Sequence, residues 1–266
     1  MKLEPVTSKD SIRLGDAQAV WPGHGKTEDE LERAATKEMD RIAELERVLY
    51  ADARFALLIV LQGRDASGKD GTIRKVFSAV NPQGCSVSSF KAPTELELHH
   101  DFLWRVHQQV PSRGMIGIFN RSHYEDILVP RVHRLVPKKV WTARYEQINE
   151  FERMLTANGV VILKFMLHVS RDEQRKRLQE RLSDERKNWK FRPDDLEDRE
   201  RWSDFTKAYR GILAHTSTKW APWYVVPADD KDVRDLLVAR TIADALDSLG
   251  LRYPKADPSV VGLKIK

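Results

Sequence analysis

Hydrophobic positions along the chain follow two alternating periods. Thr27 and Glu30 form a capping box, and apolar residues then recur at helical spacing from position 31 to position 49. Residues 1–26 show no such period and are expected to wrap the surface as an arm. Residues 55–62 are a continuous apolar run that ends before a glycine, which is typical of a strand buried on both faces.

The same alternation repeats toward the C-terminus. Further strands are predicted over residues 86–90, 115–119, 160–167 and 223–226. Helices are predicted over residues 69–80, 94–107, 140–158 and 230–248, with another that begins near 170. Strands that alternate with helices pair in parallel through right-handed crossovers. The predicted fold class is therefore α/β, a three-layer sandwich with a central, mainly parallel five-stranded sheet.

The topology also predicts where a ligand binds. In open α/β sheets, ligands occupy the crevice beyond the carboxyl ends of the strands. This places residues 63–71, 90–94, 120–126 and 168–171 around one crevice. No repeat or glycine-serine linker divides the chain, so we expect a single domain over residues 1–266, in which an arm and helix occupy about 1–52.

Composition indicates the cellular location of the protein and the charge of its partners. The longest apolar runs are far shorter than a membrane span, and the first ten residues lack the apolar stretch of a signal peptide. Cys85 is the only cysteine, which favours a reducing, cytoplasmic location. The net charge of +5 favours acidic partners, without distinguishing nucleic acid from free phosphate polymers.

A phosphate-binding loop follows the first predicted strand. GRDASGKDG, residues 63–71, fits the first seven positions of the G-x-x-x-x-G-K-[ST] motif and lies between a strand and a helix, as that motif requires. Its glycines let backbone N–H groups face a phosphate, and its lysine adds a mobile positive charge. The expected phosphate ligands are Gly63, Arg64, Ala66, Ser67, Gly68, Lys69, Asp70 and Gly71.

Two aspartates depart from this motif. Asp70 stands where a hydroxyl usually holds Mg²⁺, so the metal must be held differently. Asp65 would repel bound phosphates unless a cation lay between them, which makes it the leading metal ligand. The alternative is a turn aspartate that bonds the loop's own amides. Asp70 is expected to face solvent in the first helical turn, where its charge suits the helix dipole.

A second cluster is MIGIFNRSHYEDILVPR, residues 115–131. The strand delivers Asn120 at its carboxyl end, where an aspartate would be usual, so Asn120 and Asp126 are further candidate metal ligands. Arg121 is expected to face the crevice, the alternative being a surface ion pair with Glu125. The segment 129–144 then lacks acidic residues and either lines a channel for a polyanion or forms a solvated face. Its basic residues are Arg131, Arg134, Lys138, Lys139 and Arg144.

The third cluster follows the fourth predicted strand. Residues 171–192 are strongly basic, and Arg177 and Arg181 share one helical face. A helical excursion over about 171–205 would suit a lid that closes over transferring phosphates, where positive charge supplies much of the catalysis. An ordinary charged helical hairpin is the alternative.

Together these stretches resemble the second family of polyphosphate kinases. The matching segments are GRDASGKDG, Asn81-Pro82, FNRSHYED, SRDEQRKRLQERL with Trp189-Lys190, and APWYVVPADDK, within about residues 28–250. Members of that family move the terminal phosphoryl group of inorganic polyphosphate to or from a nucleotide, with Mg²⁺. The resemblance implies a P-loop kinase-like fold, similar to thymidylate kinase, with a helical lid.

The resemblance also implies roles for individual residues. Asp65 would hold the metal, and Lys69 would bind phosphate. Arg121, Arg177 and Arg181 would clamp the transferring phosphates, so that the catalytic set is Asp65, Lys69, Arg121 and Arg181. Arg131 and Lys190 are further expected phosphate ligands. The expected nucleotide ligands are Lys91, Asn120, Arg121 and Glu125.

Asn120 followed by RSHYED looks like the class that phosphorylates both AMP and ADP. The expected partners are therefore polyphosphate, AMP, ADP and ATP, with no membrane or nucleic acid, in a homodimer or homotetramer. Mg²⁺ is the expected cofactor, with Mn²⁺ as an alternative. An ATP-dependent nucleotide kinase and a non-catalytic binder of polyphosphate or nucleic acid are the rival interpretations, and both leave Asp65 unexplained.

Overall fold

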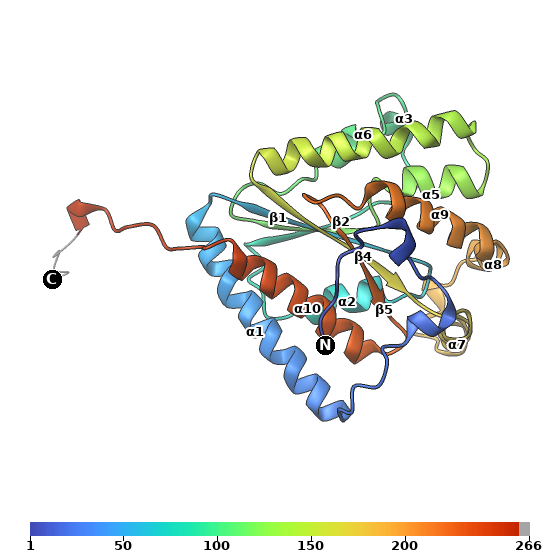
Figure 1. Ribbon diagram of the computed structural model, residues 1–266, viewed down its shortest axis with the longest axis horizontal. Helices are drawn as coiled ribbons and strands as arrows, with labels where there is room; N and C mark the ends of the chain where they lie inside the picture. The colour runs from blue at the N-terminus through green and yellow to red at the C-terminus, as the bar shows by residue number, and fades with distance from the viewer. Residues whose placement is uncertain (261–266) are drawn as a thin grey trace.

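The computed structural model describes residues 1–260, apart from the side chains of Lys190 and Val260. A parallel five-stranded sheet in the order β2-β3-β1-β4-β5 forms its centre (Figure 1). The strands are β1 (Ala56–Gly63), β2 (Cys85–Ser89), β3 (Ile116–Asn120), β4 (Val160–His168) and β5 (Trp223–Pro227). The predicted α/β fold and its five strands are confirmed.

Two layers of helices cover the sheet (Figure 1). One layer contains α1 (Glu28–Asp52), α2 (Lys69–Val76) and α10 (Lys231–Ser248), and the other contains α5 (Glu125–Val132), α6 (Lys138–Ala157) and α9 (Trp202–Thr216). Alternate residues of β1 enter the two cores: Leu57 and Ile59 pack in the first core, and Leu58 and Val60 in the second. This two-sided burial explains the continuous apolar run of β1.

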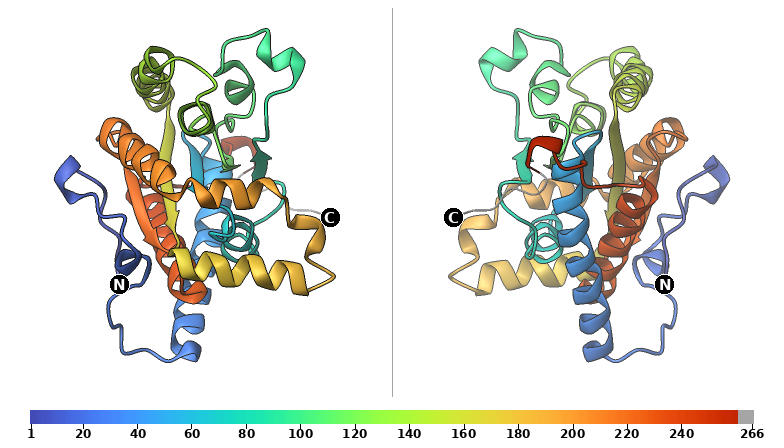
Figure 2. Two further views of the ribbon diagram at one scale, coloured as in Figure 1. Left: turned by 90° about the vertical axis from the view of Figure 1, so that its right-hand side faces the viewer. Right: turned by 90° about the vertical axis from the view of Figure 1, so that its left-hand side faces the viewer.

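The remaining helices lie mainly at the edges of these layers. Figure 2 shows α7, drawn in yellow, crossing the end of the molecule that faces the viewer in its left panel. These remaining α-helices are α3 (Glu95–Leu98), α4 (Trp104–His107), α7 (Arg171–Ser183) and α8 (Asp194–Glu200). The 3₁₀ turns are η1 (Lys9–Ser11), η2 (Asp16–Ala19), η3 (Asn188–Lys190) and η4 (Pro258–Val260).

The helix predicted over residues 94–107 is wrong in its extent, because the structure divides it into α3 and α4. Thr94 caps α3 as expected, accepting a bond from the backbone N–H of Glu97 at 3.3 Å. After α3, the Asp101 carboxylate accepts a bond from the backbone N–H of Leu103 at 3.0 Å. An aspartate side chain that bonds the backbone in this way competes with a continuous helical ladder.

Helix α5 was not predicted, since it contains Pro130. A proline in a helix leaves the carbonyl four residues earlier without its N–H donor. Here that carbonyl belongs to Asp126, and the Arg144 guanidinium of α6 donates to it instead. A side chain from a neighbouring helix thus allows α5 to form within the second sequence cluster.

The N-terminal arm packs along the edge strand β5. The Val6 N–H donates to the Trp223 carbonyl at 2.8 Å, and Ile12 and Leu14 are buried. His168, at the end of β4, contacts the Gly15 carbonyl through Nε2 at 2.9 Å. The arm therefore covers a sheet edge that would otherwise be open. No helix among residues 1–260 has the length and apolar character needed to cross a membrane.

Candidate active site

The loop after β1 has the backbone of a phosphate cradle. Gly63 and Gly68 have φ values of 154° and 105°, which side chains rarely adopt. A Cβ at Gly63 would lie 2.7 Å from the Leu167 carbonyl oxygen, and one at Gly68 would lie 2.1 Å from Nη1 of Arg234. Both positions therefore require glycine, because of the conformation and because of the close neighbours.

Lys69 is folded back across this loop. Its Nζ donates to the carbonyl oxygens of Gly63 at 2.7 Å and Arg64 at 3.2 Å. Burial lowers the pKa of Lys69, as does the nearby Arg121, while Asp65 and neighbouring carboxylates oppose the change. The ammonium group is therefore held at the loop, where a phosphate would strongly favour its charged form.

Arg121 reaches the loop from the end of β3. Its Nη2 lies 2.8 Å from Oδ1 of Asp65, and the two side chains are 41% and 21% exposed. Arg121 has a φ of 61°, and its N–H donates to the Leu61 carbonyl at 3.0 Å. This left-handed turn directs Arg121 into the crevice, as expected. Among the described residues, the Asp65 carboxylate bonds Arg121 and none of the loop's own amides.

Glu125 is the second carboxylate that faces this group. In the orientation in which both the oxygen and the nitrogen of the Gln62 amide form hydrogen bonds, the nitrogen donates to Oε1 of Glu125 at 2.9 Å. Burial raises the pKa of Glu125, and the charges of Arg121 and Lys69 oppose that rise. In turn, burial opposes the charge on Arg121, but Glu125 and Asp65 outweigh it and raise the pKa of Arg121.

Asp126 points to a different part of the molecule, which corrects its assignment as a metal ligand. Its Oδ2 lies 3.2 Å from Nη2 of Arg105. Burial raises the pKa of Asp126, with Arg105 and then Arg144 opposing. Arg105 also donates to the Lys91 carbonyl at 2.9 Å, while the Lys91 side chain is exposed. Asp126, Arg105 and Lys91 thus form a group at the segment that is expected to bind the nucleotide. Contact of Lys91 with a nucleotide stays a prediction.

Asn120 joins the end of β3 to the first turn of α2. Its Nδ2 donates to Oδ1 of Asp70 at 2.8 Å. Asp70 is exposed, as the sequence predicted, but its carboxylate also contacts Asn120 at the crevice. Two of the residues that depart from the usual motifs, Asn120 and Asp70, are therefore partners of one another.

Two arginines expected at phosphate instead brace the loop through their side chains. Arg64 stacks on Trp202, 3.8 Å from the ring centroid, and donates to Oγ1 of Thr206. Burial lowers the pKa of Arg64 to about 10. Arg177 is buried and directs all of its nitrogens at protein acceptors. These acceptors are the carbonyls of Ala66, Ser67, Ala228 and Asp229 and the Glu173 carboxylate.

Gln174 is a loop contact that sequence reasoning missed. Its Nε2 donates to the Asp65 carbonyl at 3.0 Å, beside the Arg177 contacts. Gln174 and Arg177 are three residues apart and so share one face of α7. That spacing is the only signal in the sequence that could have predicted this contact. The inner face of α7 holds the loop from behind, which leaves the loop amides to face a ligand.

Two other expected phosphate ligands, Arg181 and Arg131, contact residues outside the loop. Nη1 of Arg181 is 3.6 Å from Oδ2 of Asp195, which links α7 to α8. Arg131 donates to the Tyr145 hydroxyl at 3.0 Å and lies 4.7 Å from the Trp141 ring centroid, so it is a packing residue rather than part of an open channel. The Lys190 side chain lies outside the described residues.

The donor set fits a magnesium ion that completes its coordination with substrate. Within residues 1–260, no group of three or more His, Cys, Asp or Glu side chains is arranged to hold a metal by itself. Mg²⁺ usually takes one or two carboxylates, substrate phosphates and several waters. Asp65 is half-buried on the loop itself and fits such a site, whereas Asp126 faces Arg105 and Arg144.

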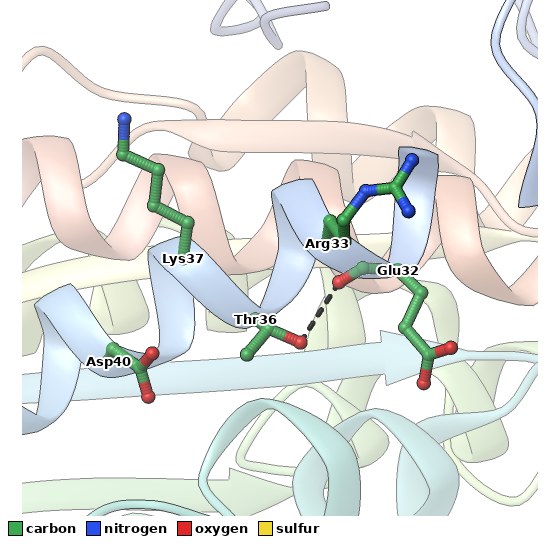
Figure 3. Close-up of a pocket in the computed structure, with 5 residues that line it drawn as sticks. All are labelled: Glu32, Arg33, Thr36, Lys37 and Asp40. Carbon is green, nitrogen blue, oxygen red and sulfur yellow. Dashed lines mark hydrogen bonds between the residues drawn. The ribbon is translucent and has the colours of Figure 1, made fainter. Parts of the chain in front are cut away.

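A separate hollow lies on the outer face of α1, lined by Glu32, Arg33, Thr36, Lys37 and Asp40 (Figure 3). Thr36 donates to the Glu32 carbonyl of its own helix at 2.9 Å. These side chains come from one exposed helical face of mixed charge and bring no converging group toward a ligand.

A phosphate cradle with Lys69, Asp65 and Arg121, at the carboxyl edge of a parallel sheet, defines a P-loop phosphotransferase. The family model described as polyphosphate kinase 2 (PPK2) matches residues 25–252. The chain belongs to this family and is a polyphosphate-dependent nucleotide phosphotransferase.

Individual relatives support this assignment. The chain is 54% identical over 217 residues to the AMP/ADP-polyphosphate phosphotransferase of Meiothermus ruber, covering 82% of this chain and 81% of that one. It is 43% identical to the ADP-polyphosphate phosphotransferase of Rhodopseudomonas palustris, covering 93% of each. The crystal structure of polyphosphate kinase 2 from Arthrobacter aurescens TC1 superposes with a TM-score of 0.89 at 40% identity, covering 98% of this chain and 96% of that one.

Proposed function

We propose that this protein transfers the terminal phosphoryl group of inorganic polyphosphate to AMP and to ADP, forming ADP and ATP in reversible steps. The observation that carries the proposal is the Arg121–Asp65 ion pair at the mouth of the Lys69 loop. A cradle for anions gains nothing from a carboxylate unless a cation joins the substrate. The relative from Meiothermus ruber, named for both AMP and ADP, supports the choice of acceptors.

Polyphosphate suits this cradle as the donor. Each of its phosphates carries charge, and the chain has no base or ribose for a protein to recognise. Backbone amides of residues 63–71 together with Lys69 can hold it at any point along its length. Phosphoryl transfer depends mainly on positioning and charge neutralisation, which these groups supply.

Mg²⁺ is the proposed cofactor, with Mn²⁺ as an alternative, and it would neutralise charge on the phosphates next to Asp65. With Asp65 holding the cation, the Arg121 guanidinium would be released from this ion pair and would be available to the transferring phosphoryl group. Arg121 and Lys69 together would stabilise the charge that develops in the transition state.

The acceptor is proposed to lie on the opposite side of the crevice, near Lys91, Asn120 and Glu125. The attacking oxygen belongs to a nucleotide phosphate, whose second pKa is about 6, so most of it is ionised at neutral pH. The chain therefore needs no strong general base. Asn120 is neutral and would constrain the metal less than an aspartate, which suits a site that seats both AMP and ADP.

The helical segment over about 171–205 is proposed to act as a lid within a single domain of residues 1–266. Helices α7 and α8 would bring Arg181 toward phosphates, provided that Arg181 leaves Asp195. We further propose a homodimer or homotetramer in the cytoplasm, without nucleic acid as a partner. Light scattering of the purified protein tests the oligomeric state.

A chromatographic time course from pure AMP and polyphosphate, with Mg²⁺ and no ATP, tests the function. We expect ADP to appear first and ATP to follow. Accumulation of ADP alone would leave an AMP-specific enzyme, and reaction of ADP but not AMP would leave an ADP-specific one. A parallel reaction with ATP as the sole donor to AMP tests the rival ATP-dependent kinase. A lack of any nucleotide product would favour a polyphosphate-binding protein.

A further inference from the structure

Arg234, in the first turn of α10, lies against the end of the phosphate loop. Its side chain is only 4% exposed. Its Nη1 and Nη2 are respectively 2.1 Å and 3.6 Å from the positions that a Cβ would take on Gly68 and Gly71. Both glycines belong to GRDASGKDG, so a further cationic side chain borders the loop that carries Lys69.

One edge of the Arg234 guanidinium is fixed by a carboxylate. Nε and Nη2 donate to the two oxygens of Asp235 at 2.8 Å and 3.0 Å. Asp235 in turn accepts a bond from Oγ1 of Thr72, on α2, at 3.0 Å. Such a two-point contact sets the plane of the guanidinium. The orientation of Arg234 is therefore fixed relative to the helix that begins at the loop.

The remaining nitrogen of Arg234, Nη1, does not contact Asp235. Nη1 has no hydrogen-bond partner among the described residues, although the side chain that carries it is more than nine-tenths buried. Nη1 is not among the fully buried side-chain atoms without a partner in the described part of the chain, so it keeps contact with solvent. An anionic oxygen of a ligand beside Gly68 would replace that solvent and pair with the charged N–H group.

We propose that Arg234 is a donor-specificity residue, whose Nη1 binds a phosphate of the polyphosphate chain beyond those held in the cradle. The inference rests on the proposed binding of polyphosphate in this loop. A nucleoside triphosphate continues past its phosphates into a neutral ribose, whereas polyphosphate continues with a charged phosphate. A guanidinium with a fixed orientation at the loop's end therefore favours the polymer as donor.

A simpler role would be to brace the loop by filling the space over Gly68. That role needs the volume of the side chain but not its charge. It would also affect every ligand of the cradle equally, whereas a contact beyond the cradle affects only a ligand long enough to reach it. Pyrophosphate and long-chain polyphosphate distinguish these roles, since pyrophosphate is short enough to fill the cradle alone.

The test is calorimetric binding of Mg²⁺-pyrophosphate and of Mg²⁺-polyphosphate to the full chain without nucleotide. Arg234→Met keeps the length of the side chain without its charge. We expect it to weaken polyphosphate binding by about 10-fold or more, the usual range for a hydrogen bond to a charged group, and pyrophosphate binding by less than about 2-fold. Its KM for polyphosphate should rise while its KM for AMP stays unchanged.

Arg240→Met is the matched control. Arg240 lies on the same helix and pairs with Glu38 and the Met1 carbonyl, away from the loop. We expect both affinities to stay unchanged in this variant. Thermal unfolding confirms that each variant is folded, and Arg234→Gln takes the place of Arg234→Met if the latter does not fold.

Wild-type polyphosphate affinity in the Arg234 variant would overturn the inference, as would an equal loss for both ligands. Either result leaves the proposed function standing, because the wild type still binds the polymer. Failure of the wild type to bind polyphosphate would instead refute the proposed function together with this inference.

Discussion

Arg121 reaches across the crevice to Asp65, with 2.8 Å between Nη2 and Oδ1. Arg121 leaves the end of β3, while Asp65 belongs to the loop after β1, and the two strands are neighbours in the sheet. Arg121 thus carries the positive charge that balances the carboxylate of the loop. In the proposed reaction Asp65 would hold the cation, and Arg121 would bind the transferring phosphoryl group.

Glu125 should make stability depend on pH. Burial raises the pKa of Glu125 against the opposing charges of Arg121 and Lys69. The folded state therefore binds this proton more tightly than the unfolded chain does, and stability falls as pH rises through the folded pKa. We expect Glu125→Gln to raise Tm at about pH 8 and to leave it unchanged at about pH 4, where both states are largely protonated.

Thermal unfolding between these two pH values measures the effect. Glu146→Gln, which removes a carboxylate from the exposed face of α6, is the control for loss of a surface charge. A lower Tm of Glu125→Gln at the higher pH would contradict the direction of the pKa shift. Activity should fall in Glu125→Gln, because the carboxylate that interacts with Arg121 and Lys69 is lost.

Lys164 and Glu152 form a buried ion pair behind residues 115–131, and their side chains are 0% and 1% exposed. Burial lowers the pKa of Lys164, and Glu152 opposes that change. Lys164→Met alone leaves the Glu152 charge buried without this partner and should reduce the free energy of unfolding by about 3–5 kcal/mol. Denaturant unfolding measures this loss.

The double variant Lys164→Met with Glu152→Gln should recover part of that loss, because it also removes the buried charge of Glu152. Lys207→Met is the control, since Lys207 forms an exposed pair with Asp204 and should change stability by less than about 0.5 kcal/mol. A loss as small as that in Lys164→Met would contradict the account of this cluster.

The basic residues after α5 and in the first turn of α6 should affect the binding of long polyphosphate chains only. Arg134, Lys138 and Lys139 are exposed, whereas Arg131 is bound to Tyr145 and is left unchanged. Replacing the three exposed residues by alanine should raise KM for long-chain polyphosphate and spare tripolyphosphate, most clearly at low salt. The control variant carries alanine at Arg33 and Lys37, which lie on the exposed face of α1. An equal effect on both lengths would make the segment a local clamp.

Asn120→Asp should change the choice of acceptor. The variant places a second carboxylate against Asp70, where the amide now donates at 2.8 Å. Two carboxylates at this distance repel unless a cation lies between them, so the metal should be held more tightly. We expect the ratio of AMP to ADP turnover to change more than KM for polyphosphate does. A constant ratio would remove Asn120 from acceptor selection.

The fold was readable from the sequence because parallel strands buried on both faces leave long apolar runs, as β1 does and as β4 does on either side of Lys164. The errors have local causes. Asp101 divides a predicted helix by bonding the backbone, and α5 forms across Pro130 because Arg144 satisfies the carbonyl that the proline leaves. Both causes depend on side-chain directions, which apolar periodicity does not report.

The site was predictable where it depends on topology. Asp65, Lys69 and Arg121 follow adjacent parallel strands, so they meet at one edge of the sheet. Glu125 and Asp126 were harder to separate, because consecutive helical residues point about 100° apart and only one of them faces the loop. The inward packing of Arg64 and Arg177 depends on distant partners in α9 and after β5, which composition cannot indicate.

Asp65→Asn, assayed for phosphoryl transfer from polyphosphate to ADP across a wide range of Mg²⁺ concentrations, decides whether Asp65 holds the metal ion. We expect the variant to fold, since the lost ion pair is partly exposed, and its kcat to be lower by about 10²–10³, comparable to Lys69→Ala. The control variant Asp172→Asn, on the exposed face of α7, should have the activity of the wild type. Near-normal activity of Asp65→Asn at every Mg²⁺ concentration would contradict the proposal that Asp65 holds the metal.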